Sequence, residues 1–213
     1  MTRIFLPALA WLVALTACSN TPPPPHWQMN ARGALDAFTS AYMSGNARVE
    51  AAEFARARQA LAATGQPEQV ARAELLRCAA QVASLVLQGC DGFEPLRQDA
   101  PAAERAYAAY LAGLAQPADA ALLPETQRSV LAGGADAVAR IPDPLSRLVA
   151  AGVLLRMGRA TPQLVAQAVD TASSQGWRRP LLAWLGVQAQ RAEAAGATEE
   201  AARLRRRMAL VAP

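Results

Sequence analysis

The sequence of 213 residues has no lysine, a single histidine, His26, and an aromatic content of only 5%. A Ser-His-Asp or Cys-His catalytic arrangement, or a histidine-based zinc site, would have to use that one histidine. His26 directly follows a run of prolines, a setting typical of a linker. We therefore predict no catalytic residue, no metal site and no cofactor, and we expect a protein that is not an enzyme.

Excess charge of one sign is also small. The basic side chains number 21, all of them arginine, against 17 acidic ones, which gives a formal net charge of +4. This excess is too weak to favour nucleic acid as a partner. Hydrophobic residues make up 53% of the chain and charged residues 18%, a composition typical of a globular protein with a buried core.

Long hydrophobic runs are missing except over residues 4–17, which contain Pro7. A membrane-spanning helix needs about 20 apolar residues, so this run is too short to cross a bilayer. It follows the basic Arg3 and ends in small residues just before Cys18. A basic start, an apolar stretch and a small-residue junction are typical of an export signal.

The junction Leu15-Thr16-Ala17-Cys18 resembles the lipobox of bacterial lipoproteins. In that family the peptide before the cysteine is removed, the thiol receives a diacylglycerol, and the new amino terminus is acylated. The resemblance implies cleavage between Ala17 and Cys18, lipidation of Cys18 and anchoring in a membrane. Ser19, in place of an aspartate, implies sorting to the outer membrane, facing the periplasm. Ordinary secretory cleavage is the alternative interpretation of the same segment.

The rest of the chain divides into a tether and one domain. We assign residues 1–17 to the cleaved signal peptide, 18–30 to a lipidated, proline-rich tether, and 31–213 to a single helical domain. Prolines 22–25 lack backbone donors and rotational freedom about φ, so they predict an extended spacer.

Apolar residues recur at spacings of three and four through the domain, which predicts α-helices and no strand. Prolines stand mostly where these helices would begin, and glycines where they would end. The polar residues from Glu74 to Gln88 keep the same spacing, which suggests one helix through Gln88. The expected helices cover residues 31–44, 47–63, 68–88, 102–115, 125–131, 135–140, 145–157, 163–174, 180–195 and 198–211.

The last four segments predict two helical hairpins that turn at Gly158 and Gly196. These glycines are 38 residues apart, within the period range of helical repeat proteins. The final hairpin is similar to a tetratricopeptide repeat at four positions, Leu185, Gly196, Ala201 and Pro213. It departs from that family at Arg205, where the repeat has an aromatic residue. The fold class is thus all-α, either a helical bundle or a short right-handed superhelix of hairpins, tetratricopeptide-like or not.

Cysteine is scarce as well, since only Cys78 and Cys90 remain once Cys18 carries lipid. Pairing is the default in an oxidising compartment. Twelve residues of continuous helix would, however, span about 18 Å, whereas disulfide-bonded Cα atoms lie about 4.4 to 6.8 Å apart. Either the helix breaks before Gly89 and the chain folds back, or the bond does not form within one chain. We favour the intramolecular disulfide.

Two groups near the C-terminus are candidate binding features. Trp177 and Trp184 are either core residues or a platform for a ligand. The second group is a set of arginines placed in the last turns of the final helix: Arg203, Arg205, Arg206 and Arg207. There they would either face the negative end of the helix dipole or contact anionic lipid head groups.

Two functions stay open at this point. The favoured one is a non-enzymatic scaffold or assembly factor of the cell envelope, held at the membrane by its lipid and binding a protein partner. The alternative is a small-ligand or peptidoglycan-acting protein with a pocket between helices. Two inward carboxylates in a deep pocket would favour the alternative, and a groove lined by arginine and aromatic residues the first. Nothing in the sequence predicts an oligomeric state.

Overall fold

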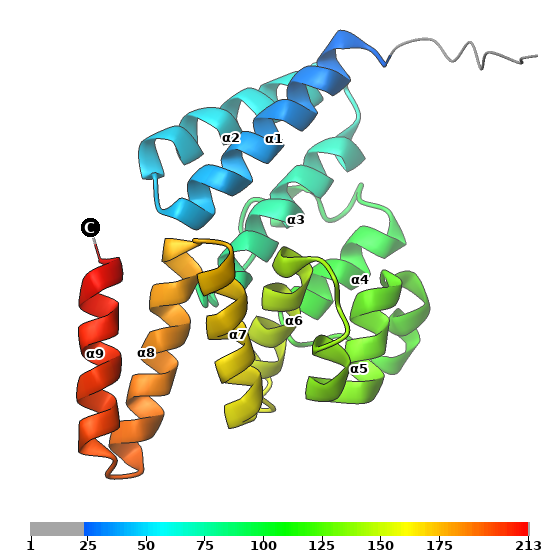
Figure 1. Cartoon of the computed structure of the whole chain (residues 1–213). Coiled ribbons are helices and arrows are strands. Elements are labelled where there is room, and N and C mark those ends of the chain that lie inside the picture. The colour runs from blue at the N-terminus through cyan, green and yellow to red at the C-terminus, as the bar shows by residue number, and fades with distance from the viewer. Residues whose placement is uncertain (1–23, 213) are drawn as a thin grey trace, which may run out of the picture.

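The computed structural model describes residues 24–212, and this range contains helices and no β-strand, which confirms the all-α prediction (Figure 1). The signal peptide, Cys18, Ser19 and the first prolines of the tether lie outside the described residues. The helices are α1 (His26–Ser44), α2 (Ala47–Ala62), α3 (Pro67–Ala83), α4 (Ala102–Leu111), α5 (Glu125–Val138), α6 (Pro144–Arg156), α7 (Pro162–Ser174), α8 (Arg178–Ala194) and α9 (Thr198–Val211), with short 3-10 helices η1 (Glu94–Leu96) and η2 (Pro117–Leu122).

The structure contains both hairpins predicted in the C-terminal half, α6–α7 and α8–α9. Capping residues and glycines define their ends. The side chains of Asp143 and Thr161 accept hydrogen bonds from backbone N–H groups three residues further on, at 2.7 and 3.1 Å, and a proline follows each. Gly158 and Gly196 take left-handed φ angles of 69° and 72° just after α6 and α8. Glycine adopts this conformation without strain, so the chain reverses into the next helix there.

The N-terminal boundary of the domain differs from the prediction. Helix α1 begins at His26, so residues 26–30, which we assigned to the tether, are helical. Trp27 is half-buried and packs against the core. The proline run therefore ends directly at a helix, with Pro25 in the N-cap position.

Three other predicted helix boundaries, in α3, α4 and α5, differ from the structure. Helix α3 stops at Ala83 instead of continuing to Gln88, and Leu85 has a positive φ of 60°. Helix α4 ends at Leu111, four residues early. The two segments expected around residues 125–140 form one element, α5, which is interrupted by a non-helical Gly134.

Helix α3 packs against α1, α2, α4 and α6. At Gly152 of α6 the two backbones approach so closely that an added β-carbon would lie 2.4 Å from the carbonyl oxygen of Val82. Helices α1 and α8, far apart in the sequence, are also in contact (Figure 1). Units of a linear repeat array contact only their neighbours, so these pairings favour the bundle over the tetratricopeptide-like array.

Candidate functional site

Trp184, one of the two candidate tryptophans, belongs to the core. Trp184 is completely buried, and its indole N–H donates a hydrogen bond of 3.0 Å to the carbonyl oxygen of Ala83 at the end of α3. Trp177 lies just before α8 and is half-buried against the core. The interpretation of Trp184 as a binding residue is therefore wrong, and its interpretation as a core residue is confirmed.

The arginine group precedes the last turn of α9. Helix α9 continues to Val211, and its last turn contains no basic residue, so the helix dipole does not explain this group. Arg206 and Arg207 are exposed and form no ion pair with any residue in the range 24–212. The other two form exposed ion pairs at 2.7 Å, Arg203 with Glu200 and Arg205 with Glu193.

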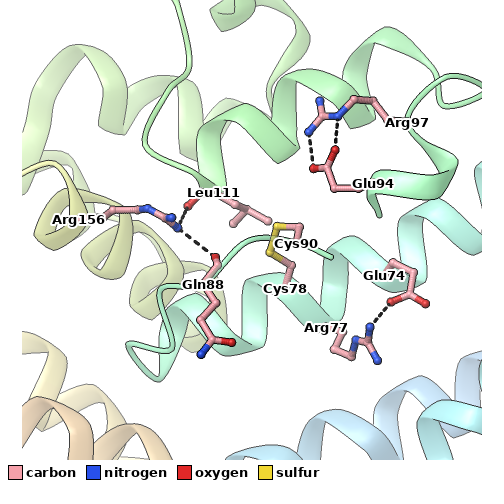
Figure 2. Close-up of a disulfide and its surroundings, with 9 residues drawn as sticks. All are labelled: Glu74, Arg77, Cys78, Gln88, Cys90, Glu94, Arg97, Leu111 and Arg156. Atoms are coloured by element: carbon pink, nitrogen blue, oxygen red, sulfur yellow. Dashed lines mark hydrogen bonds and ion pairs between the residues drawn. A yellow bond between two sulfur atoms is a disulfide. The ribbon is translucent and has the colours of Figure 1, made fainter. Parts of the chain in front are cut away.

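The predicted disulfide between Cys78 and Cys90 is present, with Cα atoms 5.4 Å apart (Figure 2). The helix breaks before Gly89, as this bond requires, and the loop after Ala83 returns beside α3. Phe93, completely buried, fixes the far end of that loop in the core.

An apolar groove of about 540 Å³ lies between α3, α4, η2 and α6. Each of these elements contributes a lining side chain, represented by Leu76, Tyr107, Leu122 and Val149. Leu122, at the edge of this hollow, is 43% exposed. We call this feature the apolar groove.

A buried carboxylate lies in the wall of the apolar groove. The Nε atom of Arg72 donates a hydrogen bond of 2.6 Å to Oε1 of Glu104, which joins α3 to α4. Glu104 is only 8% exposed, and its Oε2 accepts no hydrogen bond from the part of the chain that the structure describes. A buried polar atom without a partner costs about 1–3 kcal/mol, so this oxygen of Glu104 is unfavourable for the folded domain.

Tyr107 supplies a neutral polar group to the same wall. Burial, reinforced by the charge of Asp143, raises the pKa of Tyr107 to about 12, so the phenol keeps its proton at neutral pH. Its ring stacks on Tyr110, with centroids 6.0 Å apart and planes at 19°. Nothing in the sequence indicated that Arg72 and Glu104 form a pair.

The apolar groove differs from the usual two-carboxylate arrangement of a glycoside hydrolase. Glycoside hydrolases place two carboxyl groups around the scissile bond, and Glu104 is the one carboxylate among the lining residues described. Residues 24–212 contain no group of three or more histidine, cysteine or acidic residues placed to hold a metal ion. Across the same residues, no helix is both long and apolar enough to span a membrane.

Comparison with protein-family models, curated proteins and solved structures finds no match to this chain. The functional argument therefore depends on the groove and its polar groups. Among the sequence-predicted binding residues, none lines the groove.

Proposed function

We propose that this protein is a non-enzymatic lipoprotein of the bacterial outer membrane whose helical domain binds a segment of a partner protein in the apolar groove. The observation that carries the proposal is the groove, where apolar side chains from four elements surround an open hollow. Exposed apolar surface in a concave site is typical of protein interaction. Grooves between helices accept the apolar face of a partner helix, which inserts side chains at spacings of three and four.

Other features support an envelope location. The Cys78–Cys90 disulfide favours an oxidising compartment, because thiols in the cytosol are kept reduced. The lipobox-like junction at Cys18 and the prolines after it would supply an anchor and a spacer. The groove is lined by an arginine, a tyrosine and a single carboxylate. The arginine and the tyrosine match the lining that we expected for an interaction surface. The single carboxylate argues against the peptidoglycan-acting alternative.

The anchor is tested by labelling cells with radioactive palmitate. We expect the wild-type protein to incorporate the label and the Cys18→Ser variant to lose it completely, because the acylated thiol is absent. The matched control is Ser19→Ala, which changes the neighbouring residue and should keep the label. Wild-type protein without label, recovered in the soluble periplasmic fraction, would show that the signal is an ordinary secretory one.

The groove is tested by photocrosslinking in living cells. A photoreactive amino acid in place of Leu122, at the groove edge, should crosslink to one defined protein. The Ala103→Trp substitution puts a large ring into the groove from an exposed position on α4 and should reduce the crosslink about tenfold. Ala102→Trp, at the exposed neighbouring position outside the lining, should leave it unchanged. A crosslink that is equally strong in both variants would refute binding in the groove.

A further inference from the structure

Helix α9 carries two neighbouring positive charges without an acidic partner. Arg206 and Arg207 are exposed, and neither forms an ion pair with any residue in the range 24–212. No acidic residue follows Glu200 in this helix, which ends at Val211. The second half of α9 therefore presents an uncompensated positive charge that attracts negatively charged groups.

An exposed apolar side chain lies on the same face of α9 as these arginines. Leu210 is 87% exposed, the largest value for a large hydrophobic side chain among the described residues. It follows Arg206 by four positions and Arg207 by three, so the three side chains are neighbours on the helix surface. Leu204, on the opposite side, is buried. A leucine beside cations is suited to a membrane interface, where charged head groups lie directly above an apolar interior.

The packing of α9 places this face at the edge of the molecule. Helix α9 packs against α8 in the antiparallel direction, and an ion pair of 2.7 Å between Arg205 and Glu193 joins the two helices. The C-terminal end of α9 therefore lies toward the start of α8, on the side of the molecule where α1 and α2 lie (Figure 1). At that place Arg179 of α8 binds Glu50 of α2 at 2.8 Å. The end of α9 is thus turned toward the N-terminal helices.

The tether is long enough to bring Cys18 and this end of α9 to the same bilayer. The segment from Cys18 to His26 spans about 25 Å when it is extended. Helix α1, which starts at His26 and reaches α8 at its other end, has 19 residues and a length of about 28 Å. A tether nearly as long as α1 allows both parts of the protein to reach one membrane even when α1 is steeply inclined to it.

We propose that Arg206, Arg207 and Leu210 form a contact surface for anionic phospholipid head groups. The guanidinium groups bind phosphate oxygens through paired hydrogen bonds, and Leu210 enters the apolar layer just beneath. The inference rests on the proposed attachment of the protein to a membrane. A lipid anchor alone leaves the domain free to rotate, whereas this second contact restricts how the domain stands on the bilayer.

The test uses the full-length lipoprotein reconstituted into vesicles of phosphatidylcholine, with or without phosphatidylglycerol. A photoreactive amino acid in place of Leu210 should crosslink to lipid in the anionic vesicles. In vesicles of phosphatidylcholine alone the yield should be about tenfold lower, because the attraction between arginine and the negative surface is lost. Neutral vesicles that give the same yield would overturn the inference.

Leu114 provides a matched control position, because it is also a highly exposed leucine, at 68%. It follows Gly113, which lies against the C-terminal end of α6, near the turn between α6 and α7. That turn contacts the last part of α8 through a hydrogen bond of 2.9 Å from Arg191 to the carbonyl oxygen of Ala160. Leu114 is thus at the opposite end of the hairpins from Leu210, and the photoreactive residue there should give no lipid crosslink. An equal yield from both positions would speak against the contact.

The charge is tested by two double variants with the same change in net charge. Arg206→Gln with Arg207→Gln should lower the lipid crosslink from position 210 about tenfold in anionic vesicles. Arg140→Gln with Arg159→Gln removes two exposed arginines outside α9 and should leave the crosslink unchanged. All four side chains are exposed, so neither change should unfold the domain. Equal yields from the two double variants would contradict the proposal.

The same photoreactive residue is also tested in cells, where proteins are present as competing partners. A crosslink from position 210 to a protein, and none to lipid, would overturn the inference. Palmitate labelling tests the anchor separately. A labelled protein without lipid crosslinks would lose this inference and keep the proposed function, whereas lipid crosslinks from a protein without label would refute the anchor and keep the contact.

Discussion

Replacing Trp184 with alanine should lower the free energy of unfolding by about 4 kcal/mol. The side chain is completely buried, so its removal leaves a cavity that the surrounding helices cannot fully close. The change also removes the donor to the carbonyl oxygen of Ala83, which ends α3 and has no helical partner of its own. Urea denaturation followed by circular dichroism measures the loss.

Two further substitutions separate the packing from the hydrogen bond. Trp184→Phe keeps most of the apolar volume but loses the indole N–H, and it should cost about 1–3 kcal/mol. Trp177→Ala removes a ring of the same type from a half-buried position before α8, and it should cost clearly less than Trp184→Ala. Equal losses from the two alanine variants would contradict the different burial of the two tryptophans.

The parts of the fold that the sequence predicts well are those with local causes. Helix α9 spans the residues expected, 198–211, and α7 begins one residue early, at Pro162. Their limits depend on a capping threonine, a proline in the first turn or a glycine in the reversal, all within a few residues of the helix end. Such signals act in the chain before any tertiary contact forms.

The end of α3 could not be predicted in this way. The polar spacing continues through Ser84 to Gln88, but the helix stops at Ala83. The return of the chain is stabilised by distant groups: Trp184 donates to the last carbonyl, and Phe93 is buried in the core. These contacts join residues that periodicity does not relate, so a helical pattern alone overestimates the length of α3.

The Arg72–Glu104 pair in the apolar groove could not be predicted from the sequence either. Arg72 and Glu104 are 32 residues apart and meet only because α3 and α4 pack together. Each looks ordinary in its own segment, since an acid in the first turn of a helix is favoured by the helix dipole. Only the three-dimensional arrangement shows that one oxygen of this acid is buried without a donor.

Removing the Cys78–Cys90 disulfide by changing both cysteines to alanine should lower the free energy of unfolding by about 3 kcal/mol. The bond closes a loop between residues separated by 12 positions, which restricts the unfolded chain much more than the folded one. Cys78 is 3% exposed, and alanine there leaves only a small void, so loss of the crosslink dominates the effect. Urea denaturation with and without a reducing agent measures it.

The reducing agent supplies the control for this prediction. Reduced wild-type protein should unfold at nearly the urea concentration of the double variant, and the double variant itself should not respond to the reductant. A double variant as stable as oxidised wild type would mean that buried Phe93 and its neighbours hold the loop without the bond. Arg72 lies on the same helix, about 1.7 turns before Cys78. The groove crosslink from position 122 should therefore survive reduction as long as α3 stays folded.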